Sequence, residues 1–307
     1  MSVAPLLALG LAAVLSTLSG NTPGMTASAA TPAPPVPPPP PTVQHSATSV
    51  RPTATPRCGS STTLREGSKT WTCTFDDEFN ANTVDTSKWS AETTAGSGWT
   101  TSDTCYIANG TTISEGGGSL HLTARQLKTP MSCAGAYNTV HTGGAVVTAG
   151  KFSQAYGRFE IRAKFPATDD AGFWGNLWLY PQNLTYGAWP NSGEVDMAEH
   201  WSGHGDAVVS TLHYGGSTGA DSRSCNVNVV SQFHTYVMEW NSSTITFSRD
   251  GQTCFTRDWT SVTGSSKPFD KPFFIMLSEG YGDYVLPFAS SLPATGPVDV
   301  DYVRVYK

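Results

Sequence analysis

Clusters of basic residues are absent from this sequence of 307 residues, which is also low in charge. It contains 24 acidic and 18 basic residues, giving a net charge of -6, and charged residues make up 14% of the chain. The usual share in soluble domains is about 25%. A protein that binds nucleic acid gathers Lys and Arg on one face, because it must neutralise phosphates. The composition therefore argues against a nucleic-acid partner and favours a neutral substrate.

Aromatic side chains are absent from residues 1–56, a segment that holds 12 of the 21 prolines and one charged side chain, Arg51. Such a segment cannot bury enough surface to offset the entropy lost on ordering. The apolar run from Val3 to Val14 is too short to span a membrane but suits a signal peptide, and a small-x-small cleavage pattern follows. We therefore expect a signal peptide (1–29), a Pro-rich disordered linker (30–56), and a secreted protein without stable membrane insertion after cleavage.

C-x-x-C pairs are absent among the six cysteines, so zinc and thioredoxin chemistry have little support. Six cysteines suit an oxidising compartment and allow many pairings, among which the sequence alone cannot choose. We predict pairing between nearest neighbours, because each such pair flanks a short segment that a hairpin could close: Cys58 with Cys73, Cys105 with Cys133, and Cys225 with Cys254.

Apolar patterns of helical period are also absent from residues 57–307, where alternation of apolar and polar residues is common. From Phe159 to Phe165 every second residue is apolar, which predicts a strand with one buried face. Asp250-Gly251 separates two alternating runs and predicts a hairpin with a type I′ turn. Residues 57–307, which hold every aromatic side chain, are therefore predicted to form one all-β domain, an antiparallel sandwich of two sheets.

Three acidic residues lie within one predicted strand, in the pattern E-V-D-M-A-E. Glu194 and Asp196 share a face, because side chains alternate along a strand. Glu199 would face the opposite side unless a β-bulge at Met197 and Ala198 adds one residue, and bulges are frequent beside active sites. With that bulge, the two Glu carboxyls can approach the ~5 to 5.5 Å separation of a retaining glycosidase.

With this acidic pattern, the sequence resembles the family 16 glycoside hydrolases, and specifically the laminarinase-like endo-β-1,3-glucanases that carry the bulged motif E-x-D-x-x-E. The resemblance extends over nearly the whole domain, through Phe75–Phe79, Gly118–Ala124, Tyr156–Lys164, Trp174 with Trp178, Phe233–Trp240 and Asp301–Tyr306. It implies a concanavalin A-like β-jelly roll whose concave face holds a glycan cleft. It also implies a polysaccharide partner, a β-glucan, and we expect a monomer.

The roles of the acidic residues follow from the resemblance. It implies that Glu194 is the nucleophile, that Glu199 is the general acid and then the general base, and that Asp196 hydrogen-bonds the nucleophile. The physical argument agrees, since a carboxyl that faces an ionised neighbour in a cleft has a raised pKa and can act as an acid near neutral pH. No cofactor is expected for catalysis. A solvated acidic strand or a calcium cluster is the alternative.

Aromatic platforms are needed in a glycan cleft, because sugar rings present apolar C–H faces. Trp189, five residues before Glu194, is the first candidate; Trp178 and Trp174 are as well explained by core packing. The resemblance adds three polar residues to the cleft, of which the histidine is equally consistent with a structural role: Glu160, Arg162 and His213.

A structural Ca²⁺ on the convex face is also implied by the resemblance, with Asp301, Glu78 and Gly118 at the ligand positions. Oxygen ligands suit calcium, and an ordinary exposed Asp301 is the alternative. The segment Leu277–Gly282 departs from the family pattern in the cleft wall, and Glu279 and Tyr281 are interpreted as subsite contacts particular to this chain.

The function predicted from the sequence is that of a secreted, retaining endo-glycosidase that hydrolyses internal β-1,3 linkages of laminarin-like β-glucans. Within the same family, a β-1,3/1,4-glucanase, a transglycosylase and a galactanase remain as alternatives. The alternative from another class is a non-catalytic β-glucan-binding module, which would keep an aromatic cleft but lose the catalytic glutamates.

Overall fold

The computed structural model describes residues 56–215, 220–263, 267–282 and 287–307. Contacts within the chain divide it into Met1–Pro35 and Val36–Lys307, and every described residue belongs to the second unit. The predicted signal peptide (1–29) and all of the predicted linker (30–56) except Pro56 lie outside the described residues. No helix in the described part of the chain has the length and apolar character needed to cross a membrane.

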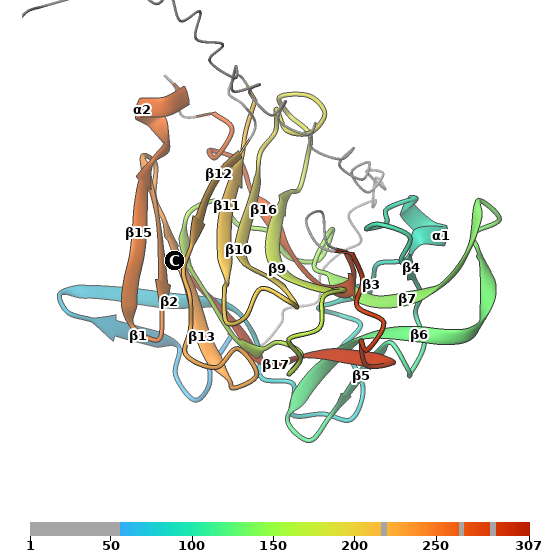
Figure 1. Cartoon of the computed structure of the whole chain (residues 1–307). Coiled ribbons are helices and arrows are strands. Elements are labelled where there is room, and N and C mark those ends of the chain that lie inside the picture. The colour runs from blue at the N-terminus through green and yellow to red at the C-terminus, as the bar shows by residue number, and fades with distance from the viewer. Residues whose placement is uncertain (1–55, 216–219, 264–266, 283–286) are drawn as a thin grey trace, which may run out of the picture. The chain divides into compact units, whose positions relative to one another are not determined.

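Two antiparallel sheets build the domain (Figure 1). The first, here named the front sheet, has its strands in the spatial order β12 (Ala220–Ser224), β11 (Val209–His213), β10 (Glu194–Trp201), β9 (Phe173–Pro181), β16 (Phe273–Tyr281), β7 (Tyr137–Val147) and β3 (Ser90–Ala91). The central strands β9 and β16 are almost wholly buried and rich in aromatic and aliphatic residues, which favour strand conformation. β10, which carries the acidic pattern, therefore lies inside the sheet between β9 and β11.

The second sheet, here named the back sheet, runs through β15 (Gln252–Asp258), β14 (Thr244–Arg249), β13 (His234–Trp240), β8 (Gly157–Lys164) and β17 (Thr295–Tyr306). Different parts of β17 then pair with β6 (Ser119–Cys133) and β2 (Lys69–Asp77), which continue to β5 (Ile113–Gly116) and β1 (Thr63–Glu66). β7 pairs with both β6 and β16 and so joins the two sheets, and the short β4 (Cys105–Tyr106) lies parallel to β7. Short helices connect strands at α1 (Thr94–Ser97) and α2 (Trp259–Thr263).

The hydrophobic core lies between the two sheets. Phe159, Ile161 and Ala163 of β8 enter it from the back sheet, and Leu177 and Val195 enter it from the front sheet. Burying a large apolar side chain of this kind contributes roughly 1.5–3 kcal/mol. The predicted two-sheet, all-β sandwich is confirmed, and so is the predicted buried face of the strand from Phe159 to Phe165.

The predicted hairpin is confirmed at Asp250-Gly251, which connects β14 to β15. Both residues have positive φ angles, 48° and 76°, as a type I′ turn requires. The Asp250 carboxylate accepts a hydrogen bond from the backbone N–H of Thr235 at 2.9 Å and pairs with His234 Nδ1 at 2.6 Å. The turn is therefore fixed against β13, the neighbouring strand.

All three predicted disulfides are present: Cys58–Cys73, Cys105–Cys133 and Cys225–Cys254. They close loops of 15, 28 and 29 residues in sequence separation. A disulfide that closes a loop of this size typically stabilises a fold by about 2–4 kcal/mol, chiefly by restricting the unfolded chain. Cys225–Cys254 ties the segment after β12 in the front sheet to β15 in the back sheet.

Candidate active site

The acidic pattern occupies β10, and a β-bulge gives it the geometry predicted from the sequence. Asp196 pairs with Thr211 of β11 and Glu199 pairs with Val209, so Met197 and Ala198 together face a single residue. Both bulge residues are fully buried in the core cluster. Glu199 is thereby returned to the outer face of the front sheet, the face that carries Glu194 and Asp196.

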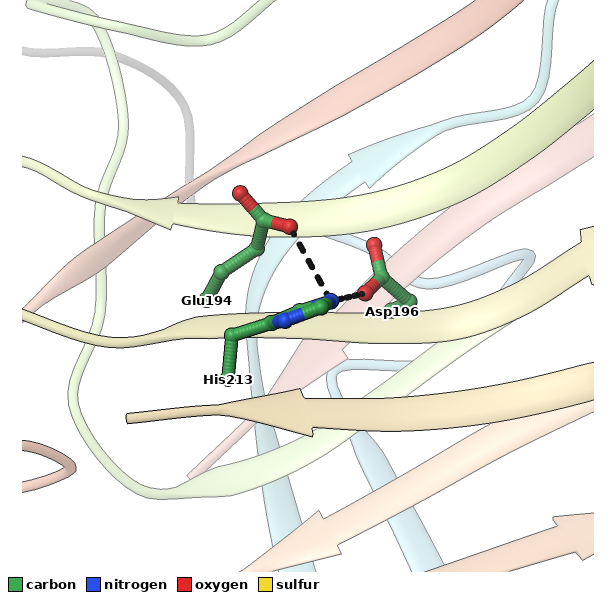
Figure 2. Close-up of side chains that lie close together, drawn as sticks. All are labelled: Glu194, Asp196 and His213. Atoms are coloured by element: carbon green, nitrogen blue, oxygen red, sulfur yellow. Dashed lines mark ion pairs between the residues drawn. The ribbon is translucent and has the colours of Figure 1, made fainter. Parts of the chain in front are cut away.

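His213 lies between two of the carboxylates, as Figure 2 shows. It is directly opposite Glu194 in the β10–β11 register. Its Nε2 is 3.2 Å from Asp196 Oδ2 and 3.5 Å from Glu194 Oε1. The structure therefore places His213 in the acidic cluster itself. Within the described residues, Glu194, Asp196 and His213 are the one group of three or more potential metal ligands whose atoms lie within 4.8 Å of one another. The ion pairs of His213 with the two carboxylates explain this close approach without a metal ion.

Two further partners of the acids were not among the residues singled out from the sequence. Asn176 Nδ2 on β9 donates to Asp196 Oδ1 at 2.8 Å, and Thr211 Oγ1 on β11 donates to Glu199 Oε2 at 3.0 Å. Alternation could have suggested both, because Asn176 lies midway between Trp174 and Trp178, and Thr211 lies two residues before His213. What the sequence lacked was the strand order that brings β9 and β11 beside β10.

The site is sheltered from solvent but reachable. The side chain of Asp196 is 2% exposed, while those of Glu194 and His213 are 14% and 19% exposed. Glu199 is 6% exposed. Carboxyls at this depth lose much of the hydration that stabilises their charged form, so their ionisation depends on nearby groups.

Burial and like charge raise the pKa of both glutamates. The pKa of Glu194 is raised to about 8 by burial and by the charge of Asp196, against the opposing effect of His213. The pKa of Glu199 is raised well above its ordinary value by the same two causes. Burial lowers the pKa of His213, but the hydrogen bond to Asp196 and the surrounding carboxylates outweigh it and raise that pKa to about 10. Both glutamates are thus favoured in their protonated form, and the charge of His213 opposes this effect at each of them.

The three candidate tryptophans lie on or beside the face that carries the acids. Trp189 is half-buried, with its ring centroid 5.3 Å from that of His213. Trp174 stacks on Trp201 at 5.8 Å with an interplanar angle of 9°. Trp178 is opposite Asp196 in the register, but it is 5% exposed and packed among aromatic neighbours, and its indole N–H donates to Ser278 Oγ at 3.2 Å. Trp189 and Trp174 are thus each partly exposed, and Trp178 packs beside Asp196 on the same face of the front sheet.

The predicted placement of Glu160 and Arg162 on the cleft floor is wrong. Both lie on β8 of the back sheet, on the face turned away from the core, because their neighbours Phe159 and Ile161 point into it. Glu160 accepts hydrogen bonds from Arg158 Nη2 and the Tyr302 hydroxyl, each at 2.8 Å. Arg162 pairs with Asp301 and lies over the Phe233 ring. The hydrophobic core separates both side chains from β10.

The predicted calcium ligands do not form a common carboxylate site. Glu78 accepts two hydrogen bonds from Arg304, at 2.8 and 2.7 Å, and the carboxylate of Asp301 pairs with Arg162. Each carboxylate thus faces an arginine, which would repel a second cation. Gly118 lies in the β5–β6 turn with a φ of 80°, beside Asn80. The side chains at these positions therefore do not fit a calcium site.

Glu279 and Tyr281 are not subsite residues, which corrects the interpretation drawn from the sequence. Both are 0% exposed and lie on the core-facing side of β16. The Glu279 carboxyl occupies the space beside Gly175, where an added Cβ would stand 2.5 Å from Oε2. Neither of its oxygens has a hydrogen-bond partner among the described residues, and burial raises its pKa well above the ordinary value.

Comparison with known proteins identifies relatives that act on glucans. Residues 99–304 match the family described as glycosyl hydrolases family 16. The chain is 31% identical over 258 residues to the glucan endo-1,3-beta-glucosidase A1 of Niallia circulans, covering 76% of this chain and 37% of that protein. It is 31% identical over 255 residues to the beta-glucanase of Rhodothermus marinus, covering 77% of this chain and 85% of that protein. It thus spans little more than a third of the first relative.

A solved structure shows the same architecture. The catalytic domain of an endo-1,3-beta-glucanase (laminarinase) from Thermotoga petrophila superposes with a TM-score of 0.69 at 26% sequence identity, covering 77% of this chain and 98% of that one. The similarity in sequence and the similarity in structure therefore extend over most of the β-sandwich.

Proposed function

Because this chain belongs to the glycosyl hydrolases of family 16, we propose that it hydrolyses internal β-1,3 linkages of a neutral β-glucan with retention of configuration. The observation that carries the proposal is the bulged β10, which presents Glu194, Asp196 and Glu199 on one sheltered face. The low charge of the chain agrees with a neutral polymer as substrate. A glycan-binding module would need no such set of acids.

Glycosylation is the first chemical step. The ionised Glu194 carboxylate attacks the anomeric carbon, while the protonated Glu199 carboxyl gives its proton to the glycosidic oxygen. The C–O bond to the leaving sugar breaks as the bond to Glu194 forms, and the reducing-end fragment departs as an alcohol. The raised pKa of Glu199 supports its role as the acid, and the positive charge of His213, 3.5 Å from Glu194, favours the ionised form of the nucleophile.

Deglycosylation reverses the roles of Glu199. Its carboxylate takes a proton from water, whose oxygen attacks the anomeric carbon and displaces Glu194 as a carboxylate. Two inversions give net retention. Asp196 and His213 take no part in bond exchange; His213 carries a positive charge between Glu194 and Asp196 and helps Glu194 to remain ionised.

Substrate binding in this proposal uses the aromatic faces along the site. Trp189 lies beside His213, and the stacked pair of Trp174 and Trp201 lies farther along the same face, where β9 and β10 pair. Sugar rings pack their C–H faces on such surfaces, which suits a chain of several residues. The linkage preference follows from these contacts.

Secretion is also proposed. The apolar run from Val3 to Val14 and the Ala27-Ser28-Ala29 pattern support export, and three disulfides agree with an oxidising compartment. N-terminal sequencing of the protein from the culture medium tests this, with a start at Ala30 expected. Retention of the full chain inside the cell would contradict it.

A substrate panel with product analysis tests the activity. Laminarin, lichenan, agarose, carrageenan and xyloglucan would be incubated with the enzyme, and reducing ends would be measured together with proton NMR of the new anomeric centre. We expect release from laminarin with the β anomer formed first. Cleavage of lichenan or a galactan alone would replace the β-1,3 assignment, transfer to a sugar acceptor would indicate a transglycosylase, and binding without cleavage would indicate a non-catalytic module.

A further inference from the structure

Two side chains converge on the backbone carbonyl of Met197, the residue at which β10 bulges. Arg249 Nη2 donates to this oxygen at 2.6 Å, and Ser210 Oγ also donates to it at 2.6 Å. The same Arg249 nitrogen donates to Ser210 Oγ, which closes a triangle of hydrogen bonds. Met197 has no pairing partner on β9, because Asp196 pairs with Trp178 and Ala198 pairs with the next residue, Leu177. The triangle thus holds the extra residue of the bulge.

Arg249 reaches this carbonyl from the opposite sheet. It ends β14 of the back sheet, at a position that follows Ile245 and Phe247 on the core-facing side. The residue is 5% exposed, and its guanidinium lies 4.9 Å from the centre of the Tyr236 ring. Its acceptors are the carbonyls of Met197 and Ser248 and the Ser210 hydroxyl, and within the described residues it forms no ion pair with a carboxylate.

A buried cation at this position is costly for folding. Taking a charge out of water without a paired opposite charge carries a large desolvation penalty, and hydrogen bonds to carbonyls offset only part of it. An apolar residue would continue the alternation of Ile245 and Phe247 at no such cost. The presence of a buried guanidinium here is explained if its hydrogen bond is needed to hold the conformation of β10.

We propose that Arg249 is a positioning residue for the general acid, because its hold on the Met197 carbonyl fixes the bulge that turns Glu199 toward Glu194 and Asp196. Glu199 follows Met197 by two residues, and without the bulge strict alternation would direct its side chain into the core. The hydrogen bonds of Arg249 within the described residues reach none of the three acids, so it acts through the backbone. The inference rests on the proposed glycosidase function.

The structure also suggests how the guanidinium group could be restored in a variant that lacks Arg249. Arg249 lines a pocket of about 420 Å³ together with Asn226, Asp250 and Gln252, next to the Cys225–Cys254 disulfide. Guanidinium ion is small enough to enter a pocket of this size. An Arg249→Ala variant therefore leaves a cavity that free guanidinium can occupy, with its N–H groups directed at the Met197 carbonyl.

The test compares substrates that do and do not need an acid. The kcat/KM of Arg249→Met and Arg249→Ala would be measured on laminarin and on dinitrophenyl β-laminaribioside, whose leaving group departs without protonation. We expect a loss of roughly 10²-fold on laminarin, the order that a misplaced catalytic group costs, and a loss of less than about threefold on the activated glycoside. Millimolar guanidinium should restore most of the laminarin activity of Arg249→Ala.

Arg257→Met is the matched control, since Arg257 lies on β15 at the edge of the back sheet and pairs with Asp221 of β12. It should keep both activities and show no response to guanidinium. Equal losses on the two substrates in folded Arg249→Met, or full laminarin activity in it, would overturn the proposal. A wild-type enzyme that cleaves no β-glucan would instead overturn the proposed function.

Two milder variants keep the test decisive if removal of the guanidinium prevents folding. Ser210→Ala removes one donor from the Met197 carbonyl and leaves Arg249 in place. Arg249→Lys keeps the charge on a shorter side chain with a single donor group. Both should show the same substrate-dependent loss at a smaller size, roughly threefold to tenfold on laminarin. No difference between the two substrates in either variant would contradict the positioning role.

Discussion

The acidic residues of the two sheets differ in the partners that surround them. On the back sheet Glu160 pairs with Arg158, Asp301 pairs with Arg162, and Glu78, just after β2, pairs with Arg304. On the outer face of the front sheet, Glu194, Asp196 and Glu199 share one histidine, and within the described residues no ion pair joins them to Lys or Arg. The three acids of the back sheet are thus each neutralised by an arginine, whereas the three acids of β10 are only partly compensated.

The consequence is visible in how the carboxyls ionise. Burial acts to raise the pKa of both Glu78 and Glu194. At Glu78 the hydrogen bonds and charge of Arg304 outweigh burial and lower the pKa, whereas at Glu194 the charge of Asp196 adds to burial. Burial alone therefore does not identify a reactive carboxyl. The reactive carboxyls are those whose negative charges are only partly balanced by a shared positive charge.

The largest expected effect comes from removing a front-sheet acid. Glu194→Gln and Glu199→Gln should each lower the release of reducing ends from laminarin by about 10³-fold or more, because each loses a bond-making or proton-transferring group. Glu78→Gln is the matched control, since it removes a compensated acid, and its activity should stay within about twofold of wild type. Full activity in Glu194→Gln would contradict the difference in function between the acids of β10 and the arginine-paired acids of the back sheet.

A smaller effect is expected from removing the shared histidine. His213→Gln takes away the positive charge that lowers the pKa of Glu194, so that pKa should rise further. Glu194 must be ionised to attack, so the acid limb of the kcat/KM profile should move to higher pH, and activity on its acid side should fall about tenfold for each pH unit that the limb moves. His121→Gln removes a histidine paired with Asp299 of the back sheet and should leave the profile in place. An acid limb that stayed put or moved to lower pH would refute the role of His213.

Glu279 offers a contrast to both groups, because it is buried with no hydrogen-bond partner among the described residues. Its folded-state pKa is raised, so the unfolded chain ionises first and stability falls as pH rises above the unfolded value, near 4.5. Glu279→Met should therefore stabilise the fold by about 1–3 kcal/mol, the cost of an unsatisfied buried polar group, and the gain should grow between about pH 5 and pH 8. Thermal melts of the two proteins across this range provide the measurement. A variant that melts lower than wild type at every pH would show that Glu279 has a stabilising partner.

The smallest effect is expected from chelation. Because Glu78 and Asp301 are each paired with an arginine, EDTA should shift the Tm by less than about 2 °C, a change of no more than about 1 kcal/mol. A large drop in Tm that added Ca²⁺ reverses would contradict this, and would show that calcium competes successfully with the arginines.

Local rules predicted much of the fold and the centre of the site. Alternation predicted the buried face of β8, and Asp250-Gly251 predicted the hairpin, because both depend on neighbouring residues only. The bulge followed from the spacing of Glu194 and Glu199. The disulfide pairs also followed from short-range reasoning, since each pair closes a segment of fewer than thirty residues.

Long-range placement was beyond the sequence. The cleft position that the resemblance implies for Glu160 and Arg162 is wrong, and alternation could not correct it, because it shows which residues share a face but not which sheet the strand joins. Asn176 and Thr211 were missed for the related reason that strand order brings them beside the acids. Arg249 and Glu279 break the rule that core positions are apolar, and no local pattern reveals a partner, or the lack of one, across the core.

Trapping the covalent intermediate tests the central claim most directly. The enzyme would be incubated with a 2-deoxy-2-fluoro-β-laminaribiosyl fluoride, which slows deglycosylation more than it slows attack by the nucleophile, then digested and analysed by mass spectrometry. The account predicts one added fluorosugar per protein, on the peptide that contains Glu194 and linked as an ester to its carboxylate. A label on a different residue, or turnover through the α anomer without any label, would contradict it.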